Sequence, residues 1–289
     1  MSQHTLLNLS DKLPTSTTDK KYWSHLHGAA QALAIAETAA AQKTLNLVIC
    51  DNSQQANELE ELVQFFAPQL TLLHFPDWET LPYDRFSPHQ DIISERLRCL
   101  YQLPQTPHGV LFVPINTLMQ RVAPQEFILN ASLQLKTGDE IDIEVLRLRL
   151  QNSNYHCVEM VYEHGEFAIR GGIIDLFPMG SEQPFRIELF DIEVEKIKTF
   201  DPETQLTTAT VESIDILPAR EFPLDKQGIN TFKDNWYEHF EDISIKESQF
   251  YEDLSQGIAF NGIEYYLPLF FEQSASLFDH LPKNCQIFT

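Results

Sequence analysis

Three short stretches carry residue types that could do chemistry. In "HLHGAAQALAIAETAA", Gly28 comes before an alanine-rich helix, where a nucleotide-binding loop would hold phosphates. The stretch "DEID", Asp139 to Asp142, superficially matches the acidic box with which helicases hold a metal ion. The stretch "EHGE", Glu163 to Glu166, offers carboxylate and imidazole groups, which are metal-ligand types.

Each of these stretches lacks a part that its chemistry needs. The first has no second glycine and no lysine in register, because the next lysine is Lys43 near the far end of the helix. The "DEID" acids come before an amphipathic helix, whose dipole favours carboxylates at its N-terminus. The "EHGE" stretch is broken by Gly165 and has no second histidine at ligand spacing, so a turn is expected. The sequence therefore predicts no catalytic residue, no metal site and no cofactor.

An arginine and phenylalanine pattern is the remaining candidate site. If "PFRIELFDIEV" forms a strand, Arg186 and Phe190 lie on the face opposite Ile187. In "EFAIRGG", Arg170 would lie near them if both strands share a sheet. Arginine and aromatic residues are enriched at interface hot spots. The alternative is that another part of the chain covers Phe190 and that local acids pair with both arginines, and the pattern leaves both interpretations open.

The elements before residue 131 predict an α/β domain. Three apolar runs have the length and composition of buried parallel strands: "LNLVIC" (45–50), "LTLLHF" (70–75) and "GVLFVP" (109–114). Helical stripes separate them, one of them behind a cap at Ser53 and another in "DIISERLRCLYQL". Strands that alternate with helices predict an open parallel sheet with helices on both faces.

The pattern changes after residue 131. The stretch "TGDEIDIEVLRLRLQNSNY" predicts a capped helix, and the strands and turns that follow it predict a small antiparallel α+β module. After "LPAREFP" (217–223) the pattern is helical again around Trp236 and Phe240. A strand-like "CQIFT" ends the sequence without a following helix, so we expect the chain to be part of something longer.

Charge and composition narrow the class of protein. The formal charge is −22, and residues 131–218 carry seven basic and seventeen acidic residues, which argues against a surface built mainly for nucleic acid. The four cysteines form no CxxC motif, which is typical of reduced thiols. With no signal-peptide pattern and no apolar run of about 18 residues, we expect a soluble, cytoplasmic protein with no membrane partner.

Four long motifs resemble a known family. They are "DWETLPYDRFSPHQDIISERL", "VPINTLMQRV", "EHGEFAIRGGIIDLFPMGSE" and "GIEYYLPLFF". In this order they resemble the N-terminal part of the bacterial transcription-repair coupling factor (Mfd) family, over a region from about Tyr22 to the end of the chain. That part of the family is similar to the nucleotide-excision-repair protein UvrB.

The resemblance implies a fold, a partner and a site. The implied fold is a degenerate helicase-type (P-loop NTPase-like) α/β parallel-sheet domain, split by an inserted small α+β domain that binds UvrA. The expected parts are residues 1–131, the inserted domain at 132–218, and a returning, truncated part at 219–289. In the family, two arginines and a phenylalanine recognise UvrA, and the motifs place them at Arg170, Arg186 and Phe190.

The sequence also departs from UvrB. It lacks the phosphate-loop lysine, and it has no room for the long aromatic hairpin between "SPHQDIISERL" and "GVLFVP". We therefore expect a non-enzymatic module that recruits UvrA in transcription-coupled repair. The resemblance places an ATP-driven DNA translocase and an RNA-polymerase-binding module downstream. Two alternatives stay open: a structural module that restrains the downstream translocase, and residual ATP or DNA binding by the helicase-like fold.

Overall fold

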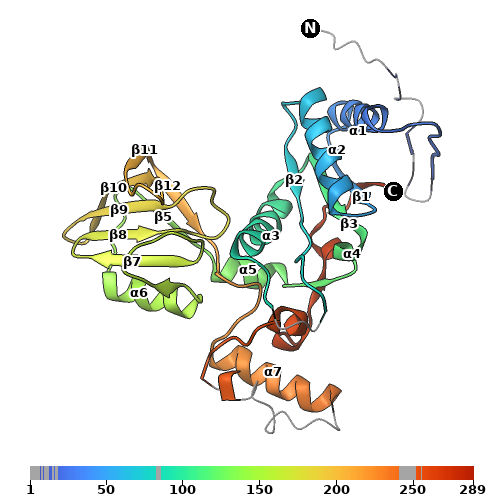
Figure 1. Ribbon diagram of the computed structural model, residues 1–289. Coiled ribbons are helices and arrows are strands. Elements are labelled where there is room, and N and C mark those ends of the chain that lie inside the picture. Colours follow the sequence, from blue (N-terminus) through green and yellow to red (C-terminus); the bar gives the residue numbers. More distant parts are fainter. Residues whose placement is uncertain are drawn as a thin grey trace. The chain divides into compact units, whose positions relative to one another are not determined.

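The computed structural model describes residues 19–82, 86–240, 252–254 and 256–289, with residues 7, 9, 13, 14 and 16 near the start of the chain. Tyr83 to Arg85, inside the first of the four family motifs, lie outside the described residues. The chain forms two compact units, whose helices and strands are labelled in Figure 1. The first contains Met1–Asp77, Gln102–Gln120 and His280–Thr289, and the second contains Trp78–Tyr101 and Arg121–Asp279. The three-part division at residues 131 and 218 stays a prediction.

A parallel four-stranded sheet forms the centre of the first unit. Its strand order is β14-β1-β3-β2, with the strands Leu45–Cys50 (β1), Leu72–His74 (β2), Gly109–Pro114 (β3) and Gln286–Phe288 (β14). The predicted parallel sheet is therefore confirmed, and the final "CQIFT" segment contributes its edge strand β14. Every side chain of β3 is buried, as expected for a strand covered on both faces.

Helices α1 (Ala29–Ala41) and α2 (Ser53–Phe66) share a core with this sheet. Ala32, Ala36 and Ala39 of α1 are buried there, and their small side chains allow the helix to pack closely. The cap predicted at Ser53 is wrong by one residue. The side chain of Asn52 accepts the hydrogen bond from the Gln55 amide, because only the residue before the first helical one can reach that amide.

The second unit contains a six-stranded sheet in the order β11-β10-β9-β8-β7-β6 (Figure 1). Neighbouring strands are antiparallel except for β6 and β7, which are parallel. The strands are His156–Cys157 (β6), Glu166–Arg170 (β7), Ile173–Leu176 (β8), Phe185–Phe190 (β9), Glu193–Phe200 (β10) and Thr207–Val211 (β11). This sheet agrees with the small antiparallel module expected from the sequence.

Smaller elements complete the second unit. Two short antiparallel pairs join β5 to β12 and β4 to β13. The bounds are Gln90–Gln102 (α3), Arg121–Val122 (β4), Gln125–Ala131 (α5), Leu133–Lys136 (β5), Ile143–Asn152 (α6), Ser213–Ile216 (β12), Lys226–His239 (α7), Ile263–Phe270 (η4), Ala275–Ser276 (β13) and Leu277–His280 (η5). The first unit also contains η2 (Leu103–Gln105) and α4 (Ile115–Leu118). In the described part of the chain, no helix is long and apolar enough to cross a membrane.

The four cysteines differ in exposure, and this difference gives a test of the fold. Cys50 and Cys99 are buried, Cys285 is partly buried and Cys157 is exposed, all as free thiols. Burial raises the pKa of both Cys50 and Cys285 to about 11. The thiolate is the reactive form of cysteine. At pH 8, each of these two thiols is ionised in only about one molecule in a thousand.

We expect one fast-reacting thiol when the native protein is treated with a disulfide reagent at pH 8, and we expect it to be Cys157 on β6. The Cys157→Ser variant should lose this fast phase. Unfolding in guanidinium should expose the other three thiols to the reagent. Peptide mapping of the labelled protein identifies the site. Fast labelling of Cys50 or Cys99 in the native protein would contradict their burial.

Candidate functional site

The three residues expected to recognise a partner lie on the six-stranded sheet of the second unit. Arg170 is the last residue of β7, and Arg186 and Phe190 belong to β9. Strand β8 lies between β7 and β9, so the two arginines are not direct cross-strand neighbours. The register pairs Arg186 with Asp175 of β8, and paired residues lie on the same face of a sheet.

Asp175 binds both arginines. Its carboxylate accepts two hydrogen bonds from Arg186, from Nε to Oδ1 at 2.7 Å and from Nη2 to Oδ2 at 3.0 Å. Arg170 Nη2 also donates to Asp175 Oδ2. Asp175 is 1% exposed, so this carboxylate is a buried anion that needs cationic partners. The hydrogen bonds from Arg186 to Asp175 are also the main cause that raises the pKa of this arginine.

Arg186 is further held by groups beside Asp175. Its guanidinium carbon lies 5.1 Å from the ring centroid of Phe200, a cation–π distance, and Nη1 donates to the backbone oxygen of Gln205 at 3.3 Å. Phe200 belongs to a small buried cluster with Val161, to which Gln205 is also hydrogen-bonded. Arg186 is therefore fixed on three sides by its own chain.

Exposure separates the three predicted residues. The side chain of Arg170 is 48% exposed and that of Arg186 is 19% exposed, whereas Phe190 is 74% exposed. Each of the two open interpretations therefore describes part of the surface: the arginines pair with a local acid, but Phe190 projects into solvent. Phe190 lies four residues beyond Arg186, about 13 Å along the strand, so it does not belong to the same tight cluster.

Neighbouring residues on this face were missing from the sequence-based site. Glu188 lies between Arg186 and Phe190 and pairs with Lys198 of β10 at 2.6 Å. The register places Ile173, which is 39% exposed, opposite Glu188. We call Arg170, Ile173, Asp175, Arg186, Glu188, Phe190 and Lys198 the Arg–Phe face. One feature of the sequence signals Asp175: it is an acid inside the apolar run "GGIIDLFP". An acid at such a place needs a buried partner.

The acidic stretches that resembled metal sites have structural roles. Asp142 caps α6, and its carboxylate accepts from the amides of Glu144 at 2.8 Å and Val145 at 3.1 Å. In the "EHGE" turn, Glu166 accepts from two backbone amides, those of Tyr162 and Glu163. Among the described residues, no group of three or more histidine, cysteine or acidic side chains is arranged to hold a metal ion.

A buried ionic cluster lies elsewhere in the second unit. Arg96 of α3 bonds Glu221 from Nε to Oε1 at 2.5 Å, and both side chains are almost fully buried. Arg220 lies 3.4 Å from Glu264, which also accepts from Ser87 at 2.9 Å. Burial raises the pKa of Glu264 and lowers that of Arg220. These groups join α3, the segment after β12 and η4.

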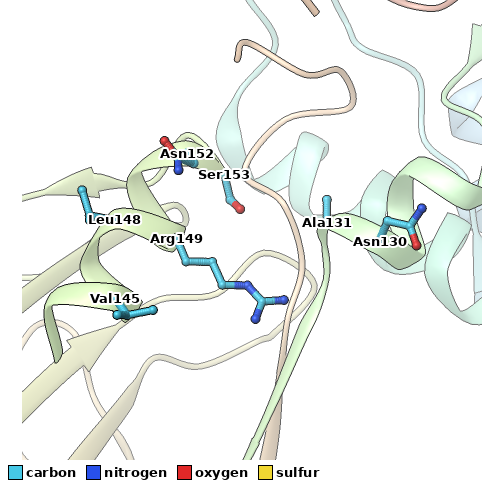
Figure 2. A pocket seen from close by; sticks show the side chains of 7 residues that line it. All are labelled: Asn130, Ala131, Val145, Leu148, Arg149, Asn152 and Ser153. Atoms are coloured by element: carbon cyan, nitrogen blue, oxygen red, sulfur yellow. The ribbon is translucent and has the colours of Figure 1, made fainter. Parts of the chain in front are cut away.

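An open groove lies between α5 and α6, as Figure 2 shows from close by. Its volume is about 430 Å³, and its lining residues are Asn130, Ala131, Val145, Leu148, Arg149, Asn152 and Ser153. Arg149 is the one ionisable side chain in this lining, and it donates to the backbone oxygen of Ser132. A single arginine provides no pair of groups for acid–base chemistry.

Comparison with known proteins first gives the class of the second unit. The family model described as the UvrB interaction domain matches residues 133–222. These residues include the six-stranded sheet and the whole Arg–Phe face. The chain is therefore a mixed α/β protein that contains a parallel sheet and a UvrB interaction domain.

Comparison over the whole chain gives its relatives. Over 272 residues the chain is 44% identical to the transcription-repair-coupling factor of Haemophilus influenzae. The matched region covers 94% of this chain and 24% of the relative. The same protein of Escherichia coli is 44% identical over 273 residues, with the same coverage. That of Rickettsia bellii is 30% identical over 243 residues, or 84% of this chain and 22% of the relative. The chain is therefore similar to one region of the transcription-repair-coupling factors and spans about a quarter of the length of these curated relatives.

Proposed function

We propose that this chain is a non-catalytic docking module that recruits UvrA to transcription-coupled nucleotide excision repair through the Arg–Phe face. The observation that carries the proposal is the exposure of Phe190, a large aromatic side chain on the sheet of the UvrB interaction domain. An aromatic residue that is 74% exposed gains apolar contact only when another molecule covers it.

The charges around Phe190 support a docking surface for a polar partner. Arg170 keeps about half of its side chain exposed while one of its nitrogens is held by Asp175. An arginine held in this way loses little rotamer freedom when it binds a carboxylate or a carbonyl group. The proposed arrangement is therefore an aromatic anchor with a pre-oriented arginine on the same face.

The proposed architecture is a degenerate helicase-like domain with the UvrB interaction domain as an insert. The parallel sheet of the first unit takes strands from both ends of the chain, because β1 pairs with β3 and with β14. Sequence that returns to the same sheet after residues 133–222 is what an insertion produces. RNA polymerase and DNA are proposed partners only of a longer protein that carries the downstream modules.

Residual nucleotide binding is the competing function of a different class. A phosphate loop follows a strand and ends in a lysine, whereas the described residues 19–27 before Gly28 contain no strand, and the sequence has no lysine in register. This supports the docking proposal over an ATPase. If Mg²⁺-ATP at millimolar concentration raised the melting temperature, binding of ATP to the native state would be favoured instead.

We expect Phe190→Ala and Arg170→Ala each to weaken binding of purified UvrA by about 2 kcal/mol, roughly 30-fold, by calorimetry. Arg186→Ala should weaken it by a similar factor, but this variant also leaves Asp175 with one arginine fewer, so its melting temperature must be compared with wild type. A triple-alanine variant that remains folded should show no measurable binding.

Two matched controls make this experiment specific. Phe65→Ala removes an aromatic residue that is 78% exposed on α2 in the other unit. Arg147→Ala removes an exposed arginine of α6 that pairs with Glu144 rather than with the sheet. Both variants should bind UvrA like the wild type. Wild-type affinity in the folded triple variant would show that the Arg–Phe face is not the docking surface.

A further inference from the structure

The two edges of the six-stranded sheet differ in length and in protection. One edge is β6, which has two residues, His156 and Cys157. The other edge is β11, "TTATV" (Figure 1). The first four residues of β11 are exposed. Among the described residues, no strand pairs with the outer side of β11. Natural edge strands are usually shortened, or carry lysine or proline that prevents pairing. Strand β6 fits this rule, whereas β11 contains no charged residue and no proline.

The hydrogen bonds of Ala209 show which backbone groups of β11 are free to bind. Its N–H donates to Thr199 Oγ1 at 3.1 Å, and the same hydroxyl lies 3.4 Å from the Ala209 carbonyl oxygen. This side-chain hydroxyl takes the place of a ladder bond, because the register of β10 and β11 shifts between Lys198 and Phe200. Beyond the shift Thr210 pairs with Lys198, and Phe200 donates its N–H on the β9 side, to Pro184. Because the backbone groups alternate in direction along β10, those of Lys198 also face β9 and those of Thr210 point outward. Thr210 thus presents a donor and an acceptor to an incoming strand.

The charge around β11 selects the kind of strand. Residues 200–216 contain four acids, Asp201, Glu203, Glu212 and Asp215, and no lysine or arginine. Glu203 and Glu212 are exposed on either side of β11. Leu206, directly before the strand, is 68% exposed and can cover an apolar side chain of the occupant. A second copy of this chain would bring the same acids and a formal charge of −22, so it would be repelled.

We propose that β11 is a second docking surface, which binds an extended segment of a partner protein, rich in lysine or arginine, by adding a strand to the sheet. Main-chain hydrogen bonds from Thr210 hold the segment, and the flanking acids select its charge. This surface is an edge of the sheet, whereas Arg170, Arg186 and Phe190 lie on β7 and β9, with β10 between β9 and β11. The inference does not depend on the proposed binding of UvrA.

The test uses a fluorescent heptapeptide of alternating lysine and valine with blocked ends, titrated with the protein and followed by anisotropy. We expect Thr210→Pro to weaken its binding at least about tenfold, because proline removes an outward N–H. A proline at this place in an edge strand is compatible with the fold, since no ladder bond is lost. The matched control is Thr210→Val, which keeps the N–H and should bind within about twofold of wild type. Hydrogen exchange should show new protection at Thr210 with the peptide bound.

Further arms keep the proposal open to contradiction. If Thr210→Pro does not fold, Thr210→Lys replaces it, since a lysine at this exposed edge repels the cationic peptide. The same peptide with glutamate for lysine should not bind. The Arg170/Arg186/Phe190 triple-alanine variant should bind the lysine peptide like wild type. The proposals for the two surfaces can therefore be contradicted independently of each other. Equal affinity in wild type and Thr210→Pro, absent protection of β11, or a dimer of the protein in light scattering would each overturn the proposal.

Discussion

Replacing Glu221 by glutamine should destabilise the protein by about 3–5 kcal/mol, because it removes the buried carboxylate that faces the Arg96 guanidinium. The Arg96 and Glu221 side chains are 0% and 1% exposed, so water cannot replace the lost hydrogen bonds when the pair is broken. A loss of this size is a large part of the stability of a typical domain. Chemical denaturation followed by tryptophan fluorescence would measure it.

The same helix provides a matched control. Arg98, two residues further along α3, pairs with Glu182 at 3.2 Å, but this pair is 36% and 86% exposed. Arg98→Ala should therefore cost at most about 1 kcal/mol. The double variant Arg96→Met/Glu221→Leu should recover most of the loss, since a well-packed apolar pair can replace a buried ion pair. Equal destabilisation by Glu221→Gln and Arg98→Ala would contradict the buried pair.

The pair also explains how the UvrB interaction domain is attached within the second unit. Glu221 lies at the end of the matched region 133–222, and Arg96 lies on α3, 125 residues earlier. Arg98–Glu182 and the bond from Gly180 N to Ser94 Oγ join the same helix to the domain. Helix α3 therefore holds the domain by one strong buried contact and several weaker ones.

The sequence predicted the elements whose cause is local. A strand buried on both faces needs a continuous apolar run, so β1 and β3 were found with their correct bounds. The Asp142 cap of α6 was found among the "DEID" acids because capping depends on the next three residues only. The Ser53 cap was misplaced by one residue, because Asn52 and Ser53 are both good capping residues and the pattern does not choose between them.

The sequence could not predict contacts between distant segments. Alternation placed Phe190 opposite Ile187, but whether that face is covered depends on residues elsewhere in the chain. The exposure of the aromatic side chains differs along this face: Phe200 is buried in a cluster with Val161, whereas Phe190 is exposed. The pairing of Arg96 with Glu221 has the same origin, because neither residue differs locally from an ordinary surface charge.

Asp175→Asn should both destabilise the protein and weaken its proposed binding of UvrA. Asparagine keeps the shape of the side chain but removes the negative charge that Arg170 and Arg186 share. Because both arginines are partly exposed and regain some hydration, we expect a loss of about 2 kcal/mol rather than the value for a fully buried pair. Denaturation midpoints at pH 7 would measure this loss.

The effect on binding follows from pre-orientation. Arg170 is held by Asp175 before any partner arrives, so the variant must order this side chain during binding. We expect UvrA affinity to fall about tenfold, equivalent to about 1.4 kcal/mol, although Asp175 is buried and touches no partner. The matched control is Glu188→Gln, which removes an acid from the same face but from a more exposed pair with Lys198, and should change stability by at most about 1 kcal/mol.

The two readouts of Asp175→Asn separate a positioning role from a purely structural one. If Asp175 only supports the fold, UvrA affinity measured well below the melting temperature should equal that of wild type. If it orients the arginines, affinity should fall in Asp175→Asn and should fall little further when Arg170→Ala is added, because the two changes remove the same contact. Full additivity of the two binding losses would mean that Arg170 acts without help from Asp175.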